Sequence, residues 1–169
     1  MTFEEFTAKY NGKLVDVDGF PKNNPYQCMD LYRKYVSDVL AFPQSSAVPG
    51  AKDVWGTYLS QYFTRYSNTP LGIPQKGDIV IWGTGYGPFG HIAIIQSAGL
   101  MNFTSFDQND PLGTSCHFQK HNYNGVLGWL RPKTFKLTEE QKNQKVREIF
   151  GKPISVVEQN KQAKDVLNG

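Results

Sequence analysis

Apolar residues in the first part of the chain recur at the spacing of an α-helix. Between Cys28 and Leu40 they fall in two adjoining rows with a four-residue step, namely Leu31, Tyr35 and Val39 beside Tyr32, Val36 and Leu40. Adjoining rows form one wide apolar face, which predicts an amphipathic helix over 28–40 that Pro43 ends. The capping-box pattern Thr2-Phe3-Glu4-Glu5 predicts a shorter helix as far as about Tyr10. Apolar residues at helical spacing favour another helix over 52–63.

Beyond residue 76 the pattern changes to that of β-strands. Short runs of β-branched and aromatic residues are separated by turns rich in Gly, Asn and Asp. We expect strands over residues 79–82, 91–96, 102–108, 115–119 and 126–130. Their short connections favour an antiparallel sheet. Helices followed by strands predict an α+β domain over residues 1–132.

Residues 133–169 differ in composition from the rest of the chain. They lack Trp and Cys and are rich in Lys, Gln and Glu, which predicts a helical linker or appendage. The formal net charge is +3, and the excess of basic over acidic residues lies in this tail. Such a mild charge argues against a nucleic-acid-binding protein, although it could help adhesion to an anionic surface such as a cell wall.

The N-terminal residues, the longest aliphatic run and the two cysteines indicate which cellular compartment to expect. The first ten residues, MTFEEFTAKY, lack the apolar stretch of a signal peptide, and the aliphatic run 92–95 is too short to span a bilayer. We therefore expect accumulation in the cytoplasm of the cell that makes the protein, with no membrane insertion. Cys28 and Cys116 are expected to be free thiols in that compartment.

Cys28 stands at the start of the long predicted helix. Unpaired N–H groups and the positive end of the helix dipole favour a thiolate there, and the same N–H groups can hold an oxyanion. The alternative is a small buried hydrophobic residue without chemistry.

Histidine and carboxylate partners for such a thiol lie on two predicted strands. His91 begins one strand, and alternation places it on one face with Ala93 and Ile95. Asp107 and Asn109 share a face of the next strand, and either could fix the imidazole tautomer, as the third member of a catalytic triad does. The alternatives are an edge-strand histidine without a role and a polar turn after the strand.

The ordered combination of these motifs is more specific than any one of them. It consists of Tyr-Gln-Cys-Met-Asp-Leu at 26–31, Gly-Asp at 77–78, Gly-His-Ile-Ala at 90–93, Asp-Gln-Asn at 107–109 and Gly-Trp-Leu-Arg-Pro at 128–132. This set resembles the CHAP family of peptidoglycan hydrolases over about residues 5–132. The resemblance implies a papain-like fold, with Cys28 as nucleophile and His91 as general base. The family's Glu-x-Asn pair corresponds to Asp107 and Asn109, and we favour Asp107 as the first partner of His91.

The resemblance also implies an activity. The expected reaction is hydrolysis of a peptide bond in the peptidoglycan stem or cross-bridge, with the oxyanion held by the Cys28 N–H and a group from Gln27 or Tyr26. An N-acetylmuramoyl-L-alanine amidase, a non-catalytic wall-binding module and a protease acting on proteins are the alternatives. The expected setting is a monomeric phage lysin that reaches the wall after release from the host cytoplasm.

The loop before Cys28 holds a second candidate site. Asp16, Asp18 and the carbonyl of Phe20, followed by Asp30, resemble the calcium site of some phage CHAP domains. Oxygen donors suit Ca²⁺, which takes six to eight of them. Pro21–Pro25 are extra residues relative to such compact sites, so Lys22 and Asn23 are both candidates for a last carbonyl ligand. An Asp-Gly turn and a helix-start aspartate are the alternative interpretation.

Two further groups of residues carry weaker signals. Cys116-His117-x-x-x-His121 fits no zinc spacing, so a solvent-side strand and turn is expected there. Four aromatic residues could line a substrate groove or pack in the core: Trp82, Tyr86, Phe89 and Trp129.

Overall fold

The computed structural model describes residues 1–22 and 25–133. Its helices are α1 (Phe3–Tyr10), α2 (Cys28–Tyr35), the π-helical turn η1 (Val36–Leu40), the 3₁₀ turns η2 (Ala51–Asp53) and η3 (Thr84–Tyr86), and α3 (Val54–Thr57). Its strands are β1 (Phe63–Ser67), β2 (Ile79–Trp82), β3 (His91–Ala98), β4 (Asn102–Asp107), β5 (His117–Asn122) and β6 (Val126–Pro132).

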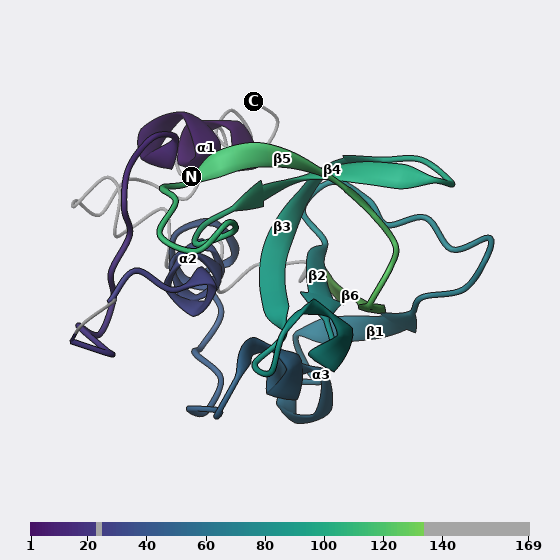
Figure 1. Ribbon diagram of the computed structural model, residues 1–169, viewed down its shortest axis with the longest axis horizontal. Helices are drawn as coiled ribbons and strands as arrows, with labels where there is room; N and C mark the ends of the chain where they lie inside the picture. Colours follow the sequence, from purple (N-terminus) through teal and green to yellow (C-terminus); the bar gives the residue numbers. More distant parts are fainter. Residues whose placement is uncertain (23–24, 134–169) are drawn as a thin grey trace, which may run out of the picture. The chain divides into compact units, whose positions relative to one another are not determined.

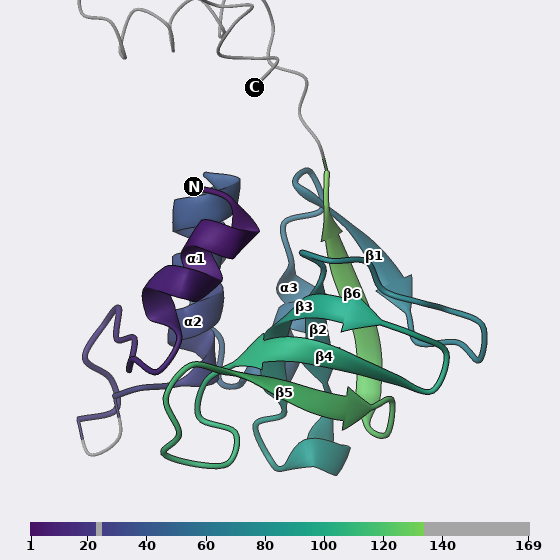
Figure 2. The ribbon, with the colours of Figure 1, turned by 90° about the horizontal axis from the view of Figure 1, so that it is seen from above.

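The strands form one antiparallel sheet in the order β1-β6-β2-β3-β4-β5. Helices α1 and α2 lie side by side against one end of it (Figures 1 and 2). The α+β class and the antiparallel sheet expected from the sequence are thereby confirmed. The Gly-Asp and Trp-Leu-Arg motifs meet across this sheet, because Arg131 Nη2 donates to Asp78 Oδ2 at 2.8 Å.

Helix α1 forms where the capping box predicted it. Thr2 Oγ1 accepts a hydrogen bond from the Glu5 N–H at 3.2 Å, and Glu5 Oε2 accepts one from the Thr2 N–H at 2.8 Å. Each side chain thus satisfies one backbone group at the open helix end. Phe6 on the buried face meets Tyr35 of α2 edge-on, with ring centroids 5.4 Å apart. This contact joins the two helices into one layer.

Both faces of the central strands are buried, and they belong to different apolar clusters. The larger cluster, between sheet and helices, includes Ile79, Ile81, Ile92, Ile94 and Phe106. The smaller cluster, on the other face, consists of Val80, Trp82, Ala93, Ile95, Phe103 and Val126. Strand alternation therefore places His91 on the side of the smaller cluster, as the sequence pattern predicted.

Two predicted helices differ from the structure, and the strand predicted over 115–119 is shifted to His117–Asn122. The helix expected over 52–63 ends at Thr57, and β1 follows it and pairs with β6. Phe63 is the buried residue of β1, while the other four positions are exposed. An edge strand of this kind has no apolar alternation for a sequence pattern to detect. The helix over 28–40 is helical throughout, but its last five residues form the π-helical turn η1.

Residues Met1–Lys133 form one compact unit. The helical appendage predicted for 133–169 lies outside the described residues, apart from Lys133 itself. Within the part of the chain that is described, no helix is long and apolar enough to cross a membrane.

Candidate active site

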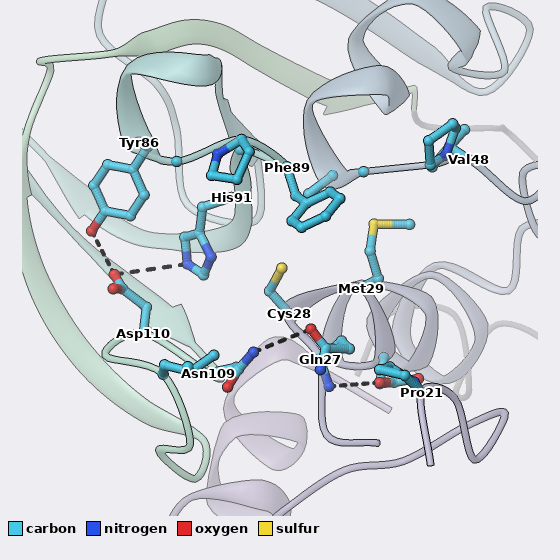
Figure 3. Close-up of a pocket in the computed structure, with 18 of the residues that line it drawn as sticks. Pro21, Gln27, Cys28, Met29, Val48, Tyr86, Phe89, His91, Asn109 and Asp110 are labelled. Carbon is cyan, nitrogen blue, oxygen red and sulfur yellow. Dashed lines mark hydrogen bonds and ion pairs between the residues drawn. The ribbon is translucent and has the colours of Figure 1, made fainter. Parts of the chain in front are cut away.

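A cavity of about 500 Å³ opens where the start of α2 faces the start of β3 (Figure 3). Cys28 and His91 both line it. Its apolar wall includes Met29, Val48 and Phe89, and its polar wall includes Asn109 and Asp110. A thiol and an imidazole that lie far apart in the sequence therefore share one cavity.

Cys28 is the first residue of α2 and is half-buried. Its sulfur lies on the side of the cavity that faces His91 (Figure 3). The turn before it is fixed by Asp30, whose Oδ2 accepts the Gln27 N–H at 2.8 Å. Because the first backbone N–H groups of a helix have no intrahelical partner, this position offers donors beside the sulfur.

His91 packs against two aromatic rings that also contact each other. Tyr86 stacks on the imidazole at a centroid distance of 5.6 Å, and Trp82 lies 5.1 Å away. Gly90 before it has φ +68°, and a Cβ there would come within 2.3 Å of the Trp82 carbonyl oxygen. A glycine is therefore required for the turn that brings His91 into the strand.

The imidazole of His91 is bound on its far side by Asp107. His91 Nε2 lies 2.8 Å from Asp107 Oδ1, and Ser105 Oγ donates to Oδ2 of the same carboxylate at 2.6 Å. Asp107 is fully buried. With Nε2 committed to the carboxylate, Nδ1 remains for the thiol side of the ring.

Burial and hydrogen bonding act in opposite directions on this pair. Burial lowers the pKa of His91, but hydrogen bonds with Asp107 and with the Cys28 side chain outweigh it and raise the pKa to about 10. Burial likewise raises the pKa of Asp107, but the imidazoles of His121 and His91 beside it hold that pKa well below its usual range. The resulting imidazolium–carboxylate pair places a positive charge beside the Cys28 sulfur at neutral pH.

Asn109 lies near the site but does not bind His91. Strand β4 ends at Asp107, and Asn109 has φ +63°, so strand alternation no longer applies to it. Its Nδ2 donates to Gln27 Oε1 at 3.2 Å, and its Oδ1 accepts the Gly113 N–H at 2.6 Å. Asn109 therefore holds the Gln27 side chain, while Asp107 holds the imidazole.

Of the two residues expected beside the oxyanion, Gln27 and Tyr26, only one is found at the cavity. Gln27 lines the cavity, whereas Tyr26 is not among the described residues that line it. Asp110 is an additional wall residue that the sequence analysis did not single out. Its Oδ2 accepts the Tyr86 hydroxyl at 2.6 Å and lies 3.9 Å from His91 Nε2. Its position directly after the Asp-Gln-Asn motif was the available signal.

Gln108 is a second residue that the sequence analysis did not assign to the site. It is fully buried, and its side chain bonds three distant segments of the chain. Oε1 accepts the Val15 N–H at 2.7 Å and the Cys116 thiol at 3.1 Å. Nε2 donates to the carbonyls of Val15 and Gln27, each at 2.8 Å. One amide thus ties the loop of the acidic residues and the residue before Cys28 to the end of β4.

We expect Gln108→Leu to lower the free energy of unfolding by about 2–4 kcal/mol, because it leaves several buried backbone groups without partners. Urea unfolding followed by circular dichroism measures the loss. The exposed Gln61 provides the matched control, since Gln61→Leu is expected to change stability by less than about 0.5 kcal/mol. Equal midpoints for the two variants would contradict this role.

The acidic residues before Cys28 do come together. One carboxylate oxygen from each of Asp16, Asp18 and Asp30 lies within 4.8 Å of the others. Burial, followed by repulsion from the other two carboxylates, raises the pKa of Asp30. Arg33 pairs with Asp18, and backbone N–H groups already occupy part of the cluster. Phe20 is exposed, and its N–H donates to Asp18 Oδ1.

The expectation that the 116–121 segment faces solvent is wrong for two of its residues. Cys116 is fully buried, and His121 is 9% exposed and packs on Trp82 at a centroid distance of 5.0 Å. His121 packs on Trp82 and Phe103 of the smaller apolar cluster, whereas Cys116, just before β5, belongs to the larger one. Trp82 and Trp129 are core residues, whereas Tyr86 and Phe89 line the cavity.

A thiol at a helix start, an imidazole facing it and a buried carboxylate behind the imidazole make up the machinery of a cysteine hydrolase. Residues 19–109 match the CHAP domain family. The match covers more than half of the chain, so the chain belongs to the CHAP domain family.

Similarity in sequence and structure to known proteins supports this assignment. Endolysin PlyTW of Staphylococcus phage Twort (strain DSM 17442 / HER 48) is 32% identical over 120 residues, which cover 63% of this chain and 25% of that protein. The crystal structure of a wild-type endolysin, LysIME-EF1, superposes with a TM-score of 0.64 at 28% identity, over 78% of this chain and 64% of that one. Ly7917 shares the fold, with a TM-score of 0.59 at 20% identity, over 78% and 62% of the two chains. The chain thus spans about a quarter of the curated relative.

Proposed function

We propose that this protein is a cysteine hydrolase that cuts amide bonds in bacterial peptidoglycan as part of a phage lysin. The observation that carries the proposal is the shared cavity of Cys28 and His91, with Asp107 bound to the imidazole at 2.8 Å. Membership of the CHAP family and the endolysins among its relatives support the substrate class. A lysin acts on the wall after release from the cell that makes it.

The geometry supports a two-step mechanism. Proton transfer from Cys28 to His91 gives a thiolate and an imidazolium. The thiolate attacks the amide carbonyl, and the oxyanion is held by the Cys28 N–H, with Gln27 beside it. As the C–N bond breaks, His91 gives its proton to the leaving amine, and a thioester remains on Cys28. Water then loses a proton to His91 and attacks the thioester, which releases the carboxylic acid and restores the enzyme.

Asp107 takes part through the imidazole. Its carboxylate fixes the ring with Nδ1 toward the sulfur and stabilises the imidazolium. Asn109 keeps the Gln27 side chain at the cavity wall. Within this proposal, Cys28 and His91 are the catalytic residues, and Asp107 and Asn109 are positioning residues.

The proposed bond is a peptide bond in the stem or cross-bridge, with the muramoyl–alanine amide as the second candidate. Mass spectrometry of fragments from purified sacculi of defined composition separates the two. We expect new amino termini within peptides and no free glycan strands. Free lactyl carboxylates on the glycan would indicate an amidase instead. Release of amino groups from casein but not from sacculi would contradict the proposed substrate class.

We also propose that Asp16, Asp18 and Asp30, with the Phe20 carbonyl, hold a structural Ca²⁺. The donor set fits this ion, because it consists of oxygen atoms from three carboxylates that already lie within reach of one another. Burial, and after it repulsion from Asp18 and Asp16, raises the pKa of Asp30, and a divalent cation would offset both effects. The Arg33 guanidinium beside Asp18 would share that carboxylate with the ion.

We expect EDTA to lower the melting temperature by about 5 °C and Ca²⁺ to restore it, because an ion that binds the folded state stabilises it. Differential scanning calorimetry measures the shift. Asp16→Asn should remove the response to Ca²⁺, whereas Glu4→Gln, which changes an exposed carboxylate on α1, should retain it. Identical melting curves with EDTA and with Ca²⁺ would remove the ion from the proposal.

A further inference from the structure

We infer that His121 is a positioning residue for the Asp107–His91 pair, so that one carboxylate serves two histidines. The inference rests on the proposed cysteine hydrolase and deepens it. His121 comes from β5, the strand on the far side of β4 from His91. The two imidazoles thus approach Asp107 from the strands on either side of it.

The contacts around Asp107 define this arrangement. Oδ1 lies 2.8 Å from His91 Nε2 and 3.4 Å from His121 Nε2, while Oδ2 accepts the Ser105 hydroxyl at 2.6 Å. Asp107 and Ser105 are fully buried, and the His121 side chain is 6% exposed. Three polar side chains therefore surround one carboxylate that water does not reach.

His121 is held in an aromatic pocket. Trp82 and Phe103 lie at centroid distances of 5.0 Å and 5.6 Å from its ring. Trp82 also contacts His91, at 5.1 Å, so both imidazoles pack on one indole. This packing leaves the His121 ring little freedom to turn away from Asp107.

A purely apolar pocket would be filled better by an apolar side chain, because burial of an imidazole nitrogen without a partner costs free energy. Among the described residues, His121 Nε2 has no hydrogen-bond partner of good geometry, and Asp107 is the polar group that it approaches. The benefit of an imidazole here is therefore its interaction with the carboxylate.

The negative charges close to the Asp107–His91 pair explain the effect of the interaction between His121 and Asp107. Cys28 and Asp110 both line the cavity, and Asp110 Oδ2 is 3.9 Å from His91 Nε2, the nitrogen that Asp107 also binds. When Cys28 is a thiolate, Asp107 and Asp110 add further negative charge close by. The polar Nε2 edge of the His121 ring, 3.4 Å from Asp107 Oδ1, stabilises the ionised carboxylate while His91 exchanges protons with the sulfur. His121 contributes to the low pKa of Asp107.

The test uses alkylation of Cys28 by iodoacetamide, followed by mass spectrometry across pH. This readout needs no peptidoglycan, so it separates the inference from the proposed substrate. We expect His121→Phe to move the acid limb of the alkylation profile to higher pH by about one unit, because Asp107 becomes easier to protonate. We also expect kcat on sacculi to fall about tenfold with KM unchanged.

Two variants make the result specific. His121→Gln can still present an N–H donor to Asp107, so we expect it to restore part of the low-pH reactivity. His117→Gln changes a histidine on the same strand whose ring is bonded to Ser115 and Gln119, and we expect it to behave as wild type. His121→Gln also serves as the informative variant if His121→Phe does not fold.

An acid limb and a kcat in the His121 variants equal to those of His117→Gln would overturn the inference. Equal losses in His121→Phe and His121→Gln would also overturn it, because packing alone would then account for the effect. The expected shift of the acid limb without any release of fragments from sacculi would instead overturn the proposed function and leave the role of His121 in place.

Discussion

Cys28→Ala is expected to abolish peptidoglycan cleavage, with a loss of at least about 10,000-fold in turbidity clearing of susceptible cells. The sulfur is the atom that forms the acyl intermediate, and alanine at this position cannot replace it. The methyl group fits the half-buried helix start, so the melting temperature should stay close to that of the wild type. Co-sedimentation with sacculi should also persist.

The other cysteine provides the control for this experiment. Cys116 is fully buried, and burial raises the pKa of its thiol to about 12, which keeps it protonated and unreactive. Cys116→Ala should therefore retain clearing, with a modest loss of stability from the bond to Gln108. Clearing by Cys28→Ala at the wild-type rate would remove the nucleophile from the mechanism, and pelleting without cleavage by the wild type would indicate a wall-binding module.

Asp107→Asn is expected to lower kcat by about 1,000-fold or more while KM changes little, because the imidazole loses the charge that holds it. The pH profile should change as well. His91 must carry a proton to give it to the leaving amine, so activity falls as pH rises through the pKa of His91. In the wild type that pKa is raised to about 10. Without the carboxylate it falls, and the alkaline limb of kcat/KM moves to lower pH.

The matched variant is Asn109→Gly, which keeps the positive φ that this position requires. Since Asn109 binds Gln27 and not His91, we expect a loss of about tenfold or less and an unchanged alkaline limb. A larger effect from Asn109→Gly than from Asp107→Asn would reverse the assignment of the imidazole partner.

The parts of the fold with a strong local pattern were predictable from the sequence. The capping box at Thr2 and Glu5 marked the start of α1, and the apolar rows after Cys28 marked α2. Strands β2 and β3 are short apolar runs between turns. By contrast, β1 holds a single buried residue, Phe63, so its presence depends on pairing with β6 rather than on its own composition.

The candidate site was predictable as far as strand alternation holds. Alternation placed His91 with Ala93 and correctly set Asp107 on a face with Ser105. It failed at Asn109, because the strand has ended and the backbone turns there. The bonds of Gln108 to Val15 and the burial of His121 against Trp82 depend on contacts between distant segments, which no local pattern contains.

The nucleophile and its base belong to different layers of the molecule, since Cys28 comes from a helix and His91 from the sheet. The distance between them is therefore set by the aromatic and aliphatic side chains packed between these layers, such as Phe6 of α1 and Phe106 of β4. A shift of about 1 Å between reacting groups can change a rate by about 100-fold. Repacking this interior for thermostability thus risks slowing catalysis from a distance, and laboratory evolution for faster variants should find beneficial changes there that never touch the substrate.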